Sequence, residues 1–154
     1  MMEKKLMDLM KEEKEKIIDL IDVLKEKRKS IEKNDLTALN SALEKEGKLL
    51  DVLNTLENER LRVTTDLSKK LSVEPTISSI LTHVQEPLRH DLTLLAARLT
   101  ELLNEVSLLN LGIQQMIAYR LEEFDVLMDA IRGKKITYDG YEKGEKGTVF
   151  NRRA

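Results

Sequence analysis

Cysteine is absent from this chain of 154 residues, and aromatic residues make up only 3% of it. Without cysteine there are no disulfide bonds, no thiolate catalysis and no cysteine-bound zinc. Only two prolines and six glycines are present, so few positions break a regular element. Because 41% of the residues are hydrophobic and few of these are aromatic, the composition predicts one domain built from aliphatic helix faces.

The sequence also lacks a large excess of either charge, since the formal net charge is only −2. A nearly neutral chain gives no overall field that would indicate nucleic acid or an anionic membrane as a partner. The first residues, Met1 to Lys5, are rich in charge, and no run approaches the roughly 20 apolar residues that a membrane-spanning helix needs. We therefore expect a cytoplasmic protein with no nucleic-acid partner and no membrane insertion.

Apolar residues recur at alternating steps of three and four along three long segments, which is the period of an amphipathic helix. The first helix is expected over residues 2–32, followed by a turn at Lys33-Asn34-Asp35. The second should end near Val73, because proline at position 75 disfavours helix in the residue before it. A short helix is expected between the two prolines. The longest helix should run from Leu88 to Arg132, with Gly133 as its stop.

This pattern predicts an all-α fold: an antiparallel bundle of three long helices plus one short connecting helix. The bundle domain should cover residues 1–133. Residues 134–154 have too little apolar area to offset the entropy of ordering, so we expect a flexible C-terminal tail there.

Four charged residues interrupt the apolar stripes of the first two helices. Glu13 and Lys27 fall on the first stripe, and Glu46 and Arg60 on the second. In an antiparallel pair, facing residues have a constant sum of positions, and Glu13 with Arg60 gives the same sum, 73, as Lys27 with Glu46. The spacing predicts two ion pairs in one register, with a register-setting role. The alternative is that all four side chains extend into solvent.

The second half of the longest helix carries an apolar stripe that continues beyond the expected length of the hairpin. At 1.5 Å per residue, the three helices would span about 46, 57 and 67 Å, so the last should project. Its stripe shifts by one residue at Met116 and Ile117. An exposed stripe of this kind marks a place where another chain packs. The alternative is that the short helix, the tail or a second copy of the protein covers it.

No pattern of catalytic or cofactor-binding residues is evident. The chain has two histidines, and His83 with Glu86 has a ligand-like spacing, but Pro87 breaks the helix that would present the pair. Glycine-rich phosphate loops and nucleophile elbows are missing. We expect neither an enzyme nor a metal or cofactor site.

Several short phrases resemble the FlgN family of flagellar export chaperones. They comprise the seam glutamate Glu13, the turn Asn34-Asp35-Leu36, Lys48-Leu49-Leu50, Leu56-Glu57-Asn58-Glu59-Arg60, Asn110-Leu111 and Thr137-Tyr138-Asp139-Gly140. In the last phrase the glycine follows the tyrosine by two residues, which departs from the family's Tyr-x-x-Gly-like pattern.

The resemblance implies a cytoplasmic chaperone that holds hook-filament junction proteins before their export through the flagellar type III apparatus. Its C-terminal helix would bind an amphipathic segment of this cargo. By this reading the cargo-binding residues are Leu109, Asn110, Ile113, Met116, Ile117, Leu121 and Phe124. Tyr138 would contact the export gate, and the free protein can form a homodimer. The competing hypothesis is a structural or tethering coiled-coil protein whose stripes serve only self-association.

Overall fold

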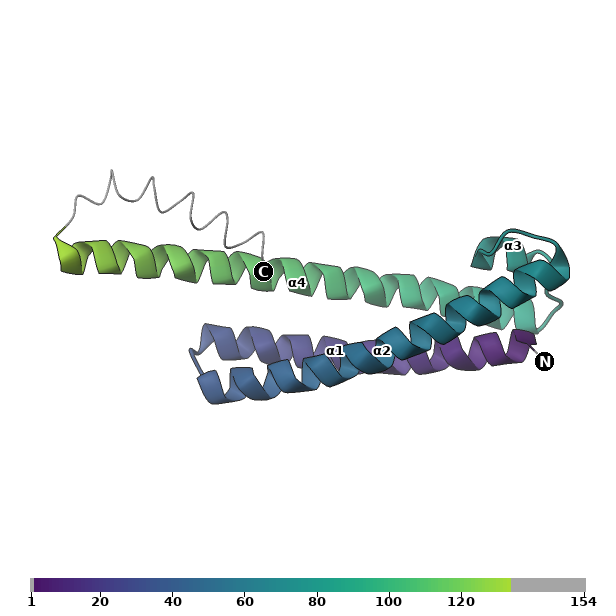
Figure 1. Cartoon of the computed structure of the whole chain (residues 1–154), viewed down its shortest axis with the longest axis horizontal. Helices are drawn as coiled ribbons and strands as arrows, with labels where there is room; N and C mark the ends of the chain where they lie inside the picture. The colour runs from purple at the N-terminus through teal and green to yellow at the C-terminus, as the bar shows by residue number, and fades with distance from the viewer. Residues whose placement is uncertain (1, 134–154) are drawn as a thin grey trace.

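The structure is a computed structural model that describes residues 2–133, and every element within this range is a helix (Figure 1). The elements are α1 (Met2–Glu32), α2 (Leu36–Leu71), α3 (Ile77–Leu81) and α4 (Leu88–Arg132). The predicted all-α class, with three long helices and one short connecting helix, is confirmed. The tail expected at 134–154 lies outside the described residues.

Local capping chemistry fixes the helix ends. The Asp35 carboxylate accepts a hydrogen bond of 3.0 Å from the Ala38 amide at the start of α2. Thr76 does the same for the Ser79 amide at the start of α3, at 3.1 Å. These bonds satisfy amides that a first helical turn leaves without partners. Gly133 ends α4 with a left-handed φ of 72°, as its position in the sequence predicts.

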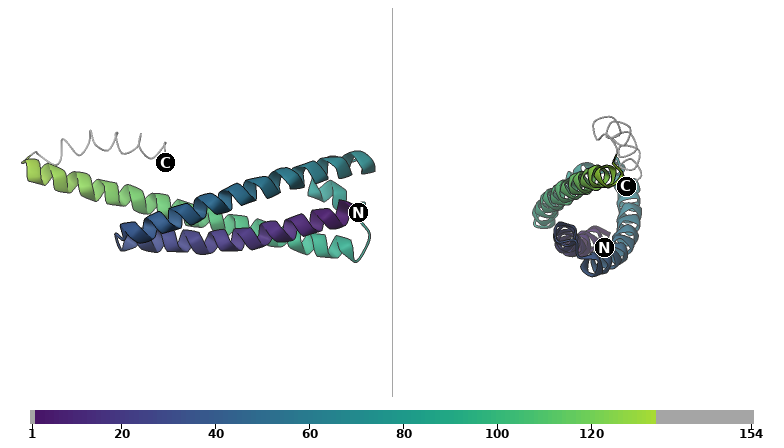
Figure 2. Two further views of the ribbon diagram at one scale, coloured as in Figure 1. Left: turned by 60° about the horizontal axis from the view of Figure 1, so that its bottom comes forward. Right: turned by 90° about the vertical axis from the view of Figure 1, so that its left-hand side faces the viewer.

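The arrangement is a hairpin with a third long helix laid along it (Figures 1 and 2). α1 and α2 are antiparallel, and α4 runs parallel to α1 and antiparallel to α2. α1 packs against both α2 and α4, whereas the Cα atoms of α2 and α4 nowhere come within 8 Å of each other in the described chain. α3 contacts α2 and α4 at the end away from the hairpin turn. The central helix of the bundle is therefore α1.

Two groups of buried aliphatic side chains form the core. The larger joins α1, α2, α3 and the first part of α4, and its most buried members are Leu6, Leu67, Ile80 and Leu92. The smaller lies nearer the hairpin turn and contains Leu20, Leu24 and Ile113. Burying this area is the main favourable term in folding, and the matched stripes of the sequence provide it.

α4 extends past the hairpin turn. The Arg120 guanidinium donates a hydrogen bond of 2.9 Å to the Glu32 carbonyl, which marks the point where α4 passes the end of α1. Twelve helical residues, 121–132, follow this point, and at 1.5 Å per residue they extend about 18 Å. We call this segment the overhang (Figure 2). No helix in the described chain is long and apolar enough to cross a membrane.

Candidate functional site

Both ion pairs expected between α1 and α2 are present. The Lys27 ammonium lies 3.0 Å from the Glu46 carboxylate, and the Arg60 Nε atom lies 3.0 Å from the Glu13 carboxylate. All four side chains are at least four-fifths buried, so they do not extend into solvent. The predicted pairing is confirmed. A register-setting role for the pairs stays a prediction.

The Arg60 site contains a third charge that the stripe analysis missed. Arg60 donates two hydrogen bonds to the Glu57 carboxylate, at 2.6 and 3.2 Å. Glu57 lies one turn away on the same helix. Its spacing of three residues from Arg60, which allows side chains on a helix to pair, is the sequence feature that indicates this contact. The guanidinium fork is therefore directed at Glu57, and Glu13 faces Arg60 from α1 without an aligned hydrogen bond at Oε1.

Burial of Glu13 in this seam changes its acidity. Loss of solvation raises the pKa of the Glu13 carboxyl to about 7, against the opposing effect of Arg60, and the nearby Glu57 charge adds to the rise. The pKa of Glu57 is lowered by its bonds to Arg60, although burial opposes this. The α1–α2 seam therefore holds a carboxyl group that titrates near neutral pH.

The seven residues predicted to bind cargo divide into two groups. Leu109, Ile113 and Ile117 pack against the core near the hairpin turn, and Ile113 is only 2% exposed. Asn110, Met116 and Leu121 are half-buried, and Phe124 is 58% exposed. The bundle therefore continues to about Arg120. A partner-binding part that begins near Leu109 stays a prediction.

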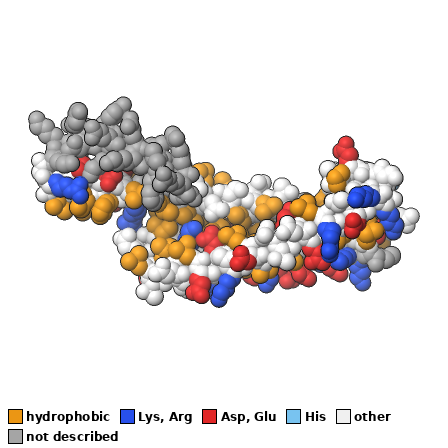
Figure 3. All heavy atoms as spheres, in the orientation of Figure 1, with side chains coloured by type: hydrophobic (Ala, Val, Ile, Leu, Met, Phe, Trp, Pro, Cys, Tyr) orange, Lys and Arg blue, Asp and Glu red, His pale blue; other side chains and the backbone are white. Residues whose placement is uncertain are grey.

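Hydrophobic side chains are visible at the surface of the overhang (Figure 3). Phe124 is joined there by three large side chains that are each at least 46% exposed: Val126, Leu127 and Ile131. The continuation of the apolar stripe already indicated Leu127 and Ile131, although the predicted contacts ended at Phe124. A second exposed line, further back on α4, contains Leu108, Leu111 and Tyr119.

Position explains why the large apolar side chains of the overhang are exposed. α1 packs on α4 only as far as its own last turn, where Arg120 binds the Glu32 carbonyl. Beyond that turn no other described helix contacts α4. Carboxylates border the apolar residues, and Glu123, through a hydrogen bond one turn away, raises the pKa of the Tyr119 phenol. An apolar strip with an acidic border suits the apolar face of an amphipathic helix.

Comparison of the sequence with models of known protein families gives a match. The family model described as FlgN protein matches residues 1–146, nearly the whole chain. The chain belongs to the FlgN family. The members of this family are chaperones of flagellar type III secretion, so the chain is a flagellar export chaperone. Neither the curated proteins nor the solved structures contain a match.

Tyr138, the residue that the FlgN resemblance predicts to contact the export gate, lies outside the described residues. The histidine considered as a metal ligand, His83, instead lies 2.8 Å from the Thr82 hydroxyl through its Nδ1 atom.

Proposed function

We propose that this FlgN-family protein binds hook-filament junction proteins in the cytoplasm and keeps them competent for export. The observation that carries the proposal is the overhang, where α4 carries large exposed apolar side chains beyond the end of α1. Such a surface is costly to leave in water, and a soluble protein keeps it for a partner.

The chemistry of the surface supports a helical cargo segment. Phe124, Leu127 and Ile131 lie at helical spacing on one side of the overhang, so a partner helix can lay its own apolar stripe along them. Met116 and Leu121 are half-buried and can extend the contact toward the bundle. The other predicted residues would then hold α4 against the bundle or lie at the edge of the cargo contact: Leu109, Asn110, Ile113 and Ile117. Thioether and leucine side chains adapt to several partner shapes.

Binding can be tested with purified protein and C-terminal fragments of hook-junction proteins. Phe124→Glu should weaken binding by about 30-fold or more, because it places a charge in the centre of an apolar contact. Leu94→Glu is the matched control, since Leu94 is 57% exposed but lies at the other end of α4. Isothermal titration calorimetry measures both. Equal affinities for the two variants, or no binding by the unmodified protein, would contradict the proposal.

The role of Tyr138 at the export gate is a second part of the proposal, carried by the resemblance of its phrase to the family's tail. Tyr138→Ala should leave affinity for the cargo fragment unchanged and reduce binding of the chaperone–cargo complex to the gate. A pull-down on gate protein, with Tyr141→Ala as the matched control, measures the difference. Equal retention of both variants would remove Tyr138 from the function.

Self-association of the free protein is also part of the proposal, in the form of a homodimer that cargo replaces. The competing reading, a tethering coiled coil, predicts that self-association persists when cargo is added. Adding a saturating cargo fragment during sedimentation analysis separates the two. Loss of the dimer supports the chaperone, and an unchanged dimer supports the tether.

A further inference from the structure

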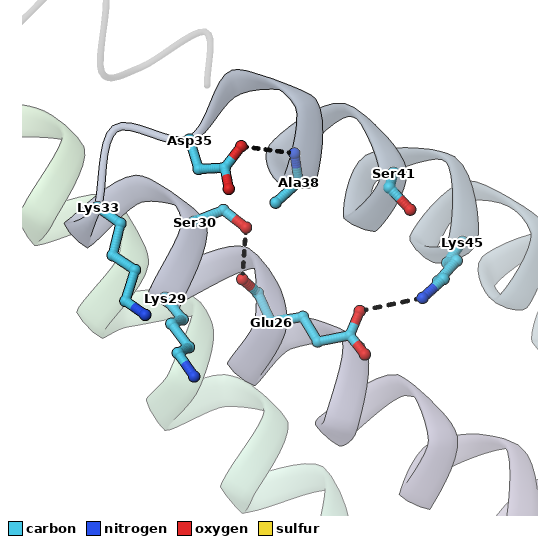
Figure 4. A pocket seen from close by; sticks show the side chains of 8 residues that line it. All are labelled: Glu26, Lys29, Ser30, Lys33, Asp35, Ala38, Ser41 and Lys45. Atoms are coloured by element: carbon cyan, nitrogen blue, oxygen red, sulfur yellow. Dashed lines mark hydrogen bonds and ion pairs between the residues drawn. The ribbon is translucent and has the colours of Figure 1, made fainter.

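A hollow lies beside the hairpin turn, between the last turns of α1 and the first turns of α2 (Figure 4). Its volume is about 370 Å³, which is within the range of small-molecule sites in proteins. Ala38 is the only apolar side chain that the described chain contributes to the lining, so an apolar ligand would find little to contact. We call this hollow the turn pocket. Its lining comprises Glu26, Lys29, Ser30, Lys33, Asp35, Ala38, Ser41 and Lys45.

Three ammonium groups border the turn pocket on two sides. Lys29 and Lys33 lie side by side, and the Lys33 amide donates a hydrogen bond of 3.0 Å to the Lys29 carbonyl, as in a helix. Lys45 reaches toward the pocket from α2 (Figure 4). Side chains four residues apart on a helix are neighbours, and like charges at that spacing repel each other. An anion between these lysines would replace the repulsion with attraction.

The two carboxylates of the lining already have partners. Asp35 accepts the capping hydrogen bond of α2 at 3.0 Å, and the Glu26 carboxylate lies 3.3 Å from the Lys45 ammonium. Among the residues that the structure describes, neither Lys29 nor Lys33 has an ion pair. Two positive charges of the turn pocket are therefore left without a negative partner.

Two further groups can donate to a ligand from α2. The Ser30 hydroxyl is bound to the Glu26 carbonyl at 2.8 Å, whereas the Ser41 hydroxyl has no hydrogen bond to any part of residues 2–133. The side chains of Lys45 and Glu26 are both more than half exposed, and exposed ion pairs contribute little to stability. Lys45 can therefore turn from Glu26 to a ligand. The donors available to a ligand are the ammonium groups of Lys29, Lys33 and Lys45 and the Ser41 hydroxyl.

Phosphate is the ligand chemistry that this donor set fits. Lysine binds phosphate as a point charge, and each phosphoryl group has several oxygens that accept charge-assisted hydrogen bonds in different directions. A carboxylate has one negative charge for three ammonium groups. Because the donors lie on two sides of the pocket, linked phosphates can contact both sides at once.

We propose that the turn pocket binds a small anion with two or more linked phosphate groups, held by Lys29 and Lys33 at the end of α1 and by Ser41 and Lys45 of α2. A free polyphosphate chain and the phosphates of a nucleotide share this chemistry. The pocket contains none of the residues proposed to bind cargo, so the inference does not rest on the proposed function. Since the donors come from two helices, the anion binds the folded hairpin and stabilises it.

Titration of the full chain with inorganic tripolyphosphate at low salt, followed by amide chemical shifts in nuclear magnetic resonance, tests the site. The largest shifts should fall within residues 26–45. Lys29→Ala with Lys33→Ala should weaken binding about tenfold or more. Lys69→Ala with Lys70→Ala is the control, because these lysines lie in the last turn of α2 as Lys29 does in that of α1, and it should leave binding nearly unchanged. Equal weakening by both pairs, or no saturation below about 10 mM, would overturn the proposal.

A variant that binds more tightly distinguishes the pocket from the charge of the whole surface. Glu26→Gln removes a carboxylate from the lining and frees Lys45, so it should tighten tripolyphosphate binding about threefold or more. Glu44→Gln makes the same change in net charge and is the control, because Glu44 pairs with Lys48 and lies outside the lining. Equal gains for the two variants would overturn the proposal in favour of a general electrostatic field.

Adenosine triphosphate, titrated beside tripolyphosphate, identifies the source of the phosphates. Tighter binding of the nucleotide would support a nucleotide ligand, and equal or weaker binding would support a free phosphate chain; both results agree with the proposal. Binding of a polyglutamate peptide at the pocket, with no binding of either phosphate probe, would overturn it in favour of an acidic protein segment. Circular dichroism checks that each variant keeps its helices.

Discussion

At the scale of the residue, the charges in the α1–α2 seam are the most informative feature. Helical spacing places four charged side chains in a leucine-rich contact, and the equal sum of positions predicts which of them pair. The Glu57 bonds to Arg60 were not identified, because a glutamate off the stripe looks like any solvated residue. Burial, which decides the acidity of Glu13, depends on how closely the two helices approach.

The pH dependence of stability should identify Glu13. Its pKa is about 7 in the folded protein against 4.5 ordinarily, so the folded state binds more protons than the unfolded state between these values. Stability from this group is complete below about pH 4.5 and decreases as the pH rises to about 7. Glu57, whose pKa is lowered, acts below this window.

Urea unfolding at pH 5 and pH 7.5 measures this effect. The free energy of unfolding of the unmodified protein should be lower at pH 7.5 than at pH 5. For Glu13→Gln this decrease should be smaller. Glu44→Gln is the control, because Glu44 is exposed and pairs only with exposed Lys48. An identical pH profile for Glu13→Gln and the unmodified protein would show that Glu13 does not titrate in this range.

The register role of the seam can be tested by exchanging charges. Glu13→Arg and Arg60→Glu alone should each cost about 1–3 kcal/mol, since each leaves like charges close together in a mostly buried site. The double variant should recover at least half of the combined loss, measured by chemical unfolding as a double-mutant cycle. Additive losses would mean that the pair does not set the register.

At the scale of the element, α4 combines two roles along one helix. Its apolar stripe continues along the whole helix, so the stripe does not indicate where α4 stops packing against α1. Ile113 and Ile131 are both isoleucines on this stripe, yet one is in the core and the other is 70% exposed. The difference comes from the end of α1 at Glu32, which Arg120 marks.

This difference predicts unequal effects of the same substitution. Ile113→Ala should cost about 2–4 kcal/mol, because it leaves a cavity beside Leu20 and Leu24. Ile131→Ala should change stability by no more than about 0.5 kcal/mol, as surface substitutions generally do. Thermal or urea unfolding of dilute protein, with cargo absent, gives both values. A large loss at Ile131 would mean that the overhang is covered within the monomer.

At the scale of the whole molecule, the two ends of the bundle differ in the helices that cover α4. At the end away from the hairpin turn, α3 packs against α2 and α4, whereas the overhang extends past the turn without a neighbouring helix in the described chain. The FlgN family model covers both ends.

The sequence by itself determined the helices, their caps, the antiparallel register of α1 and α2 and the two seam pairs. These follow from periodicity and spacing, which act over a few residues or between two segments joined by a short turn. Only the tertiary structure decided that α4 lies parallel to α1, that Leu109, Ile113 and Ile117 pack against the core, and that Phe124, Leu127 and Ile131 are exposed beyond Arg120. The physical reason is that an apolar stripe shows which face of a helix is favourable to bury. The relative lengths and positions of the packed helices decide how much of that face is buried.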